Sequence, residues 1–488
     1  MKIREKNVIL TKNYIINLTI LLLAFGGMLR RSFNADTISH MLSPDYDVSF
    51  RLMHGRYLTG LVNYLLGQLG LRTTDHTGVT VLLGLILMAL SVSVIQEMFR
   101  KFLNLEGIFE NFAYLTVTGL IYVNVLASEL MMFSEFTIFF GASFCLATVG
   151  AWYFIKQRYF LFLIYLSASC MFYQTGIIFC AILVSLYLFL DSKGLFTKAI
   201  ILRQAGVLIS VMAVGLANIL SVRVLVRFVD DFYVIKTFND SHVDNINTVV
   251  RHIINLHKNS LNLLPSLWLP LLFSLIMILV VAFIMIKKKD YQALIYFLLL
   301  QIGFLFLIYS ISLLGGYPSP PPRMIFIFYL TQVTMAIIAF IYSNELTKKL
   351  LSYIFIAYLF IHIFFAQIIV TQHFVSNTLD KLYANMVYAK IVEYEEQTGI
   401  TVTKLSVARD ADSKLTYDEV SYTSYNINER VIGILNWLVV EMVSGRSFER
   451  LVMEKDFFDE YFGDKDWLYI DLSEQLIIMD DTAYWVIF

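Results

Sequence analysis

Charged side chains are scarce in this sequence. Asp, Glu, Lys and Arg make up only 15% of its 488 residues, and 58% of the residues are hydrophobic. Soluble globular proteins average about 25% charged residues, so the composition excludes an ordinary soluble fold. The many apolar runs of roughly 18 residues or more instead predict a mainly α-helical, polytopic membrane protein.

Cysteine is scarce in this sequence, and motifs that bind nucleotides are absent from it. None of the three cysteines lies in a long loop, so we expect no disulfide framework. The sequence has no Gly-rich phosphate loop and no nucleic-acid signature, so we expect no cofactor and no nucleic-acid partner. The cysteines all lie in apolar runs: Cys145, Cys170 and Cys180.

About eleven membrane spans are predicted from the apolar runs. The stretch 159–190 is too long for one crossing of about 20 residues, so we divide it at Tyr173 and Gln174 into two short helices with a turn between them. The predicted spans are 14–29, 79–96, 110–127, 132–154, 159–172, 176–190, 205–225, 266–286, 291–314, 324–342 and 350–371.

The connections between these spans differ in charge. Every second connection is short and basic, for example at Lys156 and Arg158 or at 287–289, and the others are longer with mixed signs. Because cytoplasmic loops of membrane proteins are enriched in Lys and Arg, we place the N-terminus in the cytoplasm. An odd number of spans then puts the region after residue 371 outside, in the periplasm of a bacterial inner membrane.

The region 372–488 has the character of a separate α/β domain. It holds 10 Lys and Arg against 21 Asp and Glu, whereas the first 371 residues hold 27 against 17. A helix is expected to stop at Gly399, since glycine is favoured just past a helix end. An alternating strand follows at 401–408, then a helix at about 430–443 and a terminal hairpin of short strands.

The first outer loop, residues 30–78, is unusually polar for a connection beside a membrane span. From Ser49 to Leu66 its apolar residues recur at helical spacing, and Arg56 shares the opposite side with other polar residues. This pattern predicts one amphipathic helix on the membrane surface. Asp36 lies just beyond the end of the first span.

Further polar candidates fall at the outer face in this topology. Glu135 begins the fourth span, where a carboxylate costs roughly 2.5–3.5 kcal/mol at the bilayer centre and less near an end. Tyr173 and Gln174 lie in the predicted turn, and Arg323 ends a proline-rich loop before a later span. Structural polar residues should fall on both sides, so their convergence on one side indicates one site.

Carboxylates and arginines at the lipid surface suit one reaction well. A lipid-linked phosphosugar presents its anomeric carbon and phosphate at the interface while its tail stays in the bilayer. A carboxylate can take the proton of an acceptor hydroxyl. Arginines can bind the departing phosphate in a bidentate manner and stabilise its growing charge.

At these positions the sequence resembles the bacterial membrane glucosyltransferases that modify O-antigen, the serotype-converting type often carried by phages, within the wider GT-C class. That family often has Asp-Asp and a nearby Arg after the first span, where this chain has Ala35 before Asp36, His40 as the nearest basic residue, and Arg51 as a substitute for the missing Arg. The remaining matches are Gly55-Arg56, Glu135, Tyr173-Gln174 and Pro322-Arg323.

The resemblance implies a GT-C-like catalytic domain over residues 1–371 and an enzyme that moves glucose from undecaprenyl phosphate to an O-antigen hydroxyl of lipopolysaccharide. Asp36 is then the expected base and Glu135 a second acid. The expected substrate ligands are Arg56, Arg323, Tyr173, Gln174, His40 and Arg51. A flippase and a lipid-phosphate glucose synthase are the implied functional partners, and no metal is expected.

Simpler interpretations stand beside these. Asp36 could cap a helix, and Glu135 could form an ion pair with a neighbouring basic residue. Arg56 could anchor the chain to lipid headgroups. An O-antigen polymerase or ligase, or a lipid-linked sugar transporter, would share the same membrane setting. His242, His252 and His257 do not align on one helix face, so a solvated loop is favoured over a metal site.

Overall fold

The computed structural model describes residues 2–42, 44–103, 107–226, 242–314, 319–409, 415–465, 467 and 470–487. The chain divides into two compact units. One unit comprises Met1–Arg31 and Asp45–Ile369, and the other comprises Ser32–Pro44 and Val370–Phe488. We call them the membrane unit and the C-terminal unit.

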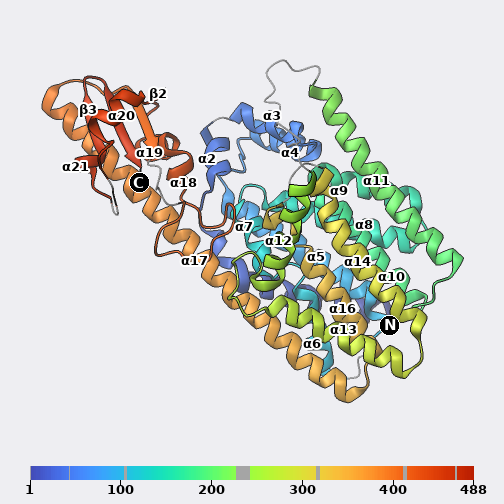
Figure 1. Cartoon of the computed structure of the whole chain (residues 1–488). Coiled ribbons are helices and arrows are strands. Elements are labelled where there is room, and N and C mark those ends of the chain that lie inside the picture. The colour runs from blue at the N-terminus through green and yellow to red at the C-terminus, as the bar shows by residue number, and fades with distance from the viewer. Residues whose placement is uncertain are drawn as a thin grey trace. The chain divides into compact units, whose positions relative to one another are not determined.

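The membrane unit consists of helices (Figure 1). In chain order these are α1 (Lys2–Phe25), η1 (Gly26–Leu29), α3 (Pro44–Met53), α4 (Tyr57–Gln68), α5 (Thr77–Arg100), α6 (Ile108–Gly119), η2 (Val125–Ala127), α7 (Ser128–Met132), α8 (Thr137–Ile155), α9 (Tyr159–Phe172), α10 (Thr175–Asp191), α11 (Lys198–Val226), α12 (His242–Asn259), α13 (Leu269–Lys287), α14 (Tyr291–Leu314), α15 (Pro322–Ile325), α16 (Phe328–Tyr342) and the first part of α17 (Glu345–Thr398).

Eight helices of the described chain are long and apolar enough to cross a membrane. They correspond to eight of the eleven predicted segments, so a mainly helical architecture with eight candidate membrane spans in the described chain is confirmed. They are Leu10–Leu29, Thr77–Arg100, Thr137–Ile155, Lys198–Leu225, Leu269–Lys287, Tyr291–Ser310, Pro322–Tyr342 and Glu345–Thr398.

The other three predicted spans form shorter helices. The segment predicted as one span over 110–127 is wrong in extent, because α6 has only 12 residues and ends at Gly119, before a turn and η2. The long run 159–190 does divide at Tyr173, as predicted, into α9 with 14 residues and α10 with 17. Helices of this length are short for a 30 Å hydrocarbon layer.

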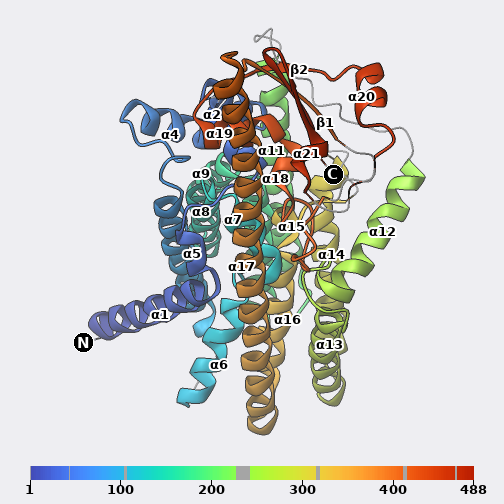
Figure 2. The ribbon, with the colours of Figure 1, turned by 90° about the vertical axis from the view of Figure 1, so that its left-hand side faces the viewer.

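Small residues allow the central helices to pack closely. Helices α5, α8 and α9 lie side by side (Figure 2). A Cβ atom added to Gly141 of α8 would lie 2.7 Å from the carbonyl oxygen of Gly84 in α5. Glycine at such a crossing lets two backbones approach, which is how helices commonly associate in membranes.

The predicted single surface helix over 49–66 is wrong, because the chain breaks at Gly55. Helix α3 ends at Met53 and α4 begins at Tyr57. Gly55 has φ +68°, and a Cβ there would clash with the side chain of Asn218. The Asn218 amide instead donates to the Gly55 carbonyl oxygen at 2.8 Å. Helical periodicity in the sequence does not show this left-handed residue.

Helix α17 joins two elements that the sequence analysis kept apart. It is one helix of 54 residues, so the predicted span 350–371 continues without interruption into the predicted helix that stops at Gly399. Gly399 follows its last residue with φ +73°, which confirms the predicted helix end.

The C-terminal unit combines helices with a four-stranded mixed sheet (Figure 1). The strand order is β2-β1-β4-β3, with β1 parallel to both neighbours and β3 antiparallel to β4, so the predicted terminal hairpin is confirmed. Its elements are α2 (Ala35–Leu42), the last part of α17, β1 (Lys404–Arg409), α18 (Val431–Ile434), α19 (Asn436–Ser444), β2 (Glu449–Leu451), α20 (Lys455–Tyr461), α21 (Leu472–Gln475), β3 (Leu476–Met479) and β4 (Thr482–Ile487).

The early segment Ser32–Pro44 folds as part of the C-terminal unit. Phe33 and Ile38 are buried in a core with Tyr383 of α17 and Trp485 of β4. The Asn377 side chain accepts a hydrogen bond from the Phe33 N–H and donates one to the Phe33 carbonyl oxygen, both at 2.9 Å. From the sequence alone, this segment was predicted to lie in the first loop of the membrane domain.

Candidate functional site

A buried ion pair links α7 to α15 in the membrane unit. The side chain of Glu129 is 0% exposed and that of Arg323 is 23% exposed. The Glu129 carboxylate accepts a hydrogen bond from the Arg323 backbone N–H at 2.7 Å, and the Arg323 guanidinium donates to its other oxygen. An isolated buried carboxylate would be very unfavourable. Glu129 therefore holds both the backbone and the side chain of Arg323.

Aromatic rings lie against two arginines, Arg56 and Arg323. We call these two residues, with Tyr173 and Glu129, the arginine cluster. The guanidinium carbon of Arg323 lies 4.6 Å from the ring centroid of Phe133, and that of Arg56 lies 5.1 Å from the ring centroid of Tyr173. The Tyr173 hydroxyl donates to the Arg323 carbonyl oxygen at 3.2 Å. Cations over aromatic faces at these distances are attracted by the ring quadrupole. Tyr173 thus connects Arg56 to Arg323.

The break between α3 and α4 is fixed to α10 and α11. Gln174, next to Tyr173, donates its side-chain N–H to the His54 carbonyl oxygen. Asn218 of α11 holds Gly55 in the same way. Two amide side chains therefore bind consecutive backbone carbonyls, and this orients Arg56, the residue that follows them.

His54 is a neutral histidine beside two cations. Burial, together with the positive charges of Arg56 and Arg323, lowers its pKa from the ordinary 6.5 to about 4, against a raising contribution from the hydrogen bond to Phe50. The ring Nδ1 lies 2.7 Å from the Phe50 carbonyl oxygen. Since a carbonyl oxygen only accepts, Nδ1 carries the proton and Nε2 is left unprotonated.

Glu135 and Arg51 lie in the same unit and are also buried. Both side chains are 0% exposed. The Arg51 guanidinium carbon lies 3.8 Å from the ring centroid of Phe136, which directly follows Glu135. The role of Glu135 as a catalytic acid stays a prediction, and a second acid of the same segment, Glu129, pairs with Arg323. The segment contains Ser-Glu twice, six residues apart, and sequence alone gave no reason to prefer the first.

Asp36 and His40 lie in α2, and therefore in the C-terminal unit. Asp36 is partly exposed and in the first turn of α2, whereas His40 is buried at 2% exposure. The structure brings Arg56, Tyr173, Gln174 and Arg323 together within the membrane unit. The roles of Asp36 as a base and His40 as a substrate ligand remain predictions.

The cluster lies at one end of the helices of the membrane unit. Tyr173 and Gln174 separate α9 from α10, and Arg323 lies at the start of the span Pro322–Tyr342. At the other end of α5 and α10, the Lys101 ammonium donates to Tyr187 at 2.6 Å and to Asp191 at 3.2 Å. The arginine cluster and the contacts of Lys101 therefore lie at opposite ends of the bundle.

Chemically, the cluster is suited to bind an anion. Arg56 and Arg323 supply two guanidinium groups, and the carboxylate of Glu129 positions Arg323. Within the described ranges, no group of three or more His, Cys, Asp or Glu side chains has the geometry of a metal site. His252 contacts the Tyr309 hydroxyl at 2.9 Å, and His257 contacts the Ile253 carbonyl oxygen at 2.8 Å.

His54 and Glu129 are the residues of this site that the sequence analysis missed. The signal for His54 was its position directly before Gly55-Arg56, and the signal for Glu129 was the duplicated Ser-Glu pair. Both became visible only through contacts between distant segments. No protein-family model, curated protein or solved structure matches the chain.

Proposed function

We propose that the chain is an integral membrane glycosyltransferase that uses a polyprenyl-phosphate sugar as its donor. The observation that carries this proposal is the assembly of Arg56, Tyr173 and Arg323 from three distant segments, with Glu129 fixing Arg323. Two oriented guanidinium groups at the end of a helical bundle are suited to bind a phosphate whose lipid tail lies in the bilayer.

In the proposed reaction, the acceptor hydroxyl oxygen attacks the anomeric carbon of the sugar. The bond from that carbon to the phosphate oxygen breaks, and polyprenyl phosphate leaves with the electron pair. Arg56 and Arg323 stabilise the negative charge that grows on the phosphate. The proton of the acceptor passes to a carboxylate, and the candidates are Glu135 and the sequence-predicted Asp36.

The side of the membrane on which the site lies is proposed from the charges at the two ends of the bundle. Lys101, Lys156 and Lys348 belong to the end opposite the arginine cluster, near the termini of α5, α8 and α16. Cytoplasmic ends of membrane helices are enriched in Lys. We therefore place the arginine cluster on the periplasmic side of a bacterial inner membrane.

The resemblance to O-antigen glucosyltransferases supplies the finer part of the proposal. The donor would be undecaprenyl-phosphate glucose and the acceptor an O-antigen hydroxyl. A flippase would deliver the donor to the outer leaflet, and a lipid-phosphate glucose synthase would make it. Membrane lipid is a further partner of any chain with these helices.

The proposal is tested with purified protein in liposomes, a panel of labelled polyprenyl-phosphate hexoses and isolated O-antigen. We expect label to move from donor to acceptor, and Arg323→Lys to lower the rate about 10²-fold, because a lysine keeps the charge but cannot bind phosphate in a bidentate manner. Lys349→Gln at the opposite end is the control and should retain the rate.

Three outcomes would contradict the proposal. Transfer by Arg323→Lys at the rate of the parent protein would remove the arginine from the reaction. Movement of labelled lipid across the bilayer with no transfer of sugar would indicate a transporter. Growth in acceptor chain length without addition of single hexoses would indicate a polymerase or ligase.

A further inference from the structure

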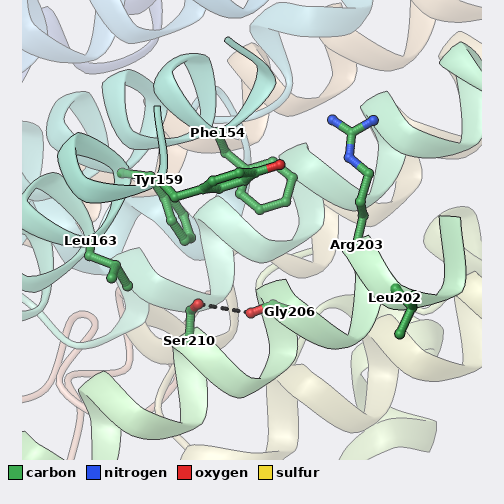
Figure 3. A pocket seen from close by; sticks show the side chains of 8 residues that line it. Phe154, Tyr159, Leu163, Leu202, Arg203, Gly206 and Ser210 are labelled. Atoms are coloured by element: carbon green, nitrogen blue, oxygen red, sulfur yellow. Dashed lines mark hydrogen bonds between the residues drawn. The ribbon is translucent and has the colours of Figure 1, made fainter. Parts of the chain in front are cut away.

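A second feature of the membrane unit lies at the opposite end of the bundle from the arginine cluster. It is a groove of about 290 Å³ between the end of α8, the start of α9 and the start of α11 (Figure 3). Phe154, Tyr159 and Leu163 lie on one side, and α11 supplies the other side with Leu202, Arg203, Gly206 and Ser210.

The walls of the groove are apolar and open to the surroundings. Leu202 is 62% exposed, Tyr159 48% and Leu163 41%. Only 11% of the apolar window of α11 is buried within the protein. In a helix long enough to cross a membrane, such an outward face contacts lipid. The groove is therefore a site on the lipid-facing surface.

Gly206 creates the open space in the α11 wall. A Cβ atom added there would meet no atom within 4 Å. The nearby Ser210 hydroxyl donates to the Gly206 carbonyl oxygen at 2.8 Å and so is satisfied within its own helix. With a rise of about 1.5 Å per residue, the wall from Arg203 to Ser210 runs roughly 10 Å, about two-thirds of one leaflet of a 30 Å hydrocarbon layer.

Arg203 gives the groove a positive charge at the end nearest the start of α11. Its guanidinium carbon lies 5.8 Å from the ring centroid of Phe154, and its Nε atom is buried without a hydrogen-bond partner in the part of the chain that the structure describes. Lys156 and Arg158 occupy the connection between α8 and α9, and Lys198 begins α11.

The segments that line the groove contribute no acid beside these cations. Residues 137–190 and 192–226 contain no Asp or Glu, and Asp191 between them is paired with Lys101 at 3.2 Å. A groove with apolar walls and a cationic mouth at the end of the membrane helices matches the two parts of an anionic phospholipid. The acyl chain fits the walls, and the phosphate fits the guanidinium.

We propose that this groove binds one anionic phospholipid, with an acyl chain packed over Gly206 and the phosphate held by Arg203. Lipid at this position would cover the exposed side of α11 and join it to α8 and α9. The proposal does not depend on the glycosyltransferase reaction, because it concerns the other end of the bundle and involves none of the residues of the arginine cluster.

The test is native mass spectrometry of the full chain, released from detergent and titrated with phosphatidylglycerol or phosphatidylcholine. We expect one tightly bound phosphatidylglycerol, at least tenfold preferred over phosphatidylcholine. Arg203→Gln should abolish this preference. Gly206→Leu should fill the groove and weaken binding of both lipids about tenfold or more.

Matched variants separate lipid binding from stability. Gly303→Leu also adds a side chain to a helical glycine with open space around it, and Lys349→Gln also removes an exposed charge at the lysine-bearing end. Both should bind phosphatidylglycerol as the parent does. Because leucine is favoured over glycine within a helix, Gly206→Leu should retain the Tm of the lipid-free parent protein.

Several results would overturn the proposal. Equal binding of the two phospholipids by the parent protein would show that the groove does not select an anionic headgroup. Full retention of phosphatidylglycerol by both Arg203→Gln and Gly206→Leu would place the lipid elsewhere. Competition by glycerophosphoglycerol, which has no acyl chains, at the same concentration as the whole lipid would show that only a free phosphate is bound.

Discussion

The Glu129–Arg323 pair leads to a quantitative prediction. In Glu129→Gln, one carbonyl oxygen must replace two carboxylate oxygens that accept from the Arg323 backbone N–H and guanidinium. The amide N–H₂ group of the glutamine would then face one of these Arg323 donors and could not accept a hydrogen bond from it. Loss of one charge-assisted hydrogen bond costs about 1.5–3 kcal/mol. Since Glu129 is fully buried and Arg323 is 23% exposed, we expect the lower part of the 3–5 kcal/mol range for a broken buried pair.

The assay is a double-mutant cycle on reversible unfolding in mixed micelles. It compares the parent protein with Glu129→Gln, Arg323→Gln and the double variant. We expect each single variant to lose about 3 kcal/mol and the double variant to lose less than the sum by about 2 kcal/mol, because the second change removes a charge already left without its partner. Losses that add within about 0.5 kcal/mol would refute a direct coupling of these two side chains.

Three further predictions concern the break at Gly55, the neutral histidine and the C-terminal unit. Gly55→Ala should destabilise the protein by about 1–3 kcal/mol through its positive φ and its clash with Asn218, and Asn218→Ala should partly restore the loss in thermal unfolding. His54 has a pKa lowered by burial to about 4, so the unfolded state binds more protons between pH 6.5 and 4. The His54 contribution makes stability fall as pH falls through that window, and the slope should change by that contribution in His54→Gln. Asp380 is fully buried and accepts from the Tyr417 hydroxyl at 2.8 Å and the Val431 N–H at 2.9 Å, so Asp380→Ala should cost about 2–3 kcal/mol and speed proteolysis after residue 415, whereas unchanged cleavage would contradict this anchoring role.

Local patterns in the sequence were sufficient for much of the fold. Apolar length located eight helices of the described chain that are long enough to cross a membrane, and the turn at Tyr173 divided α9 from α10 as expected. Gly399 ended α17, and the terminal hairpin formed. Each of these features depends on residues close together in the chain, where side-chain periodicity and glycine conformation act directly.

The errors arose where distant residues decide the outcome. The helix across Gly55 looked continuous by periodicity, but Asn218, more than 160 positions later, holds Gly55 in a conformation that breaks it. The pairing of Glu129 with Arg323 could not be predicted without knowing that Arg323 lies against α7. Pairing between distant segments leaves no local signal in one sequence, so the positions of Arg56, Tyr173 and Arg323 were expected to converge while their connecting contacts were not.

The origin of the C-terminal unit in two distant pieces of chain has a consequence for synthesis. Its core needs Phe33 and Ile38 together with Trp485, which is synthesised more than 440 residues later. That core cannot close before Trp485 has been made, and more than 300 residues of the membrane unit are synthesised in between, so its closure is slow and vulnerable. A chain cut short after Thr371 would keep those two apolar side chains while losing everything that shelters them, and quality-control proteases should recognise it.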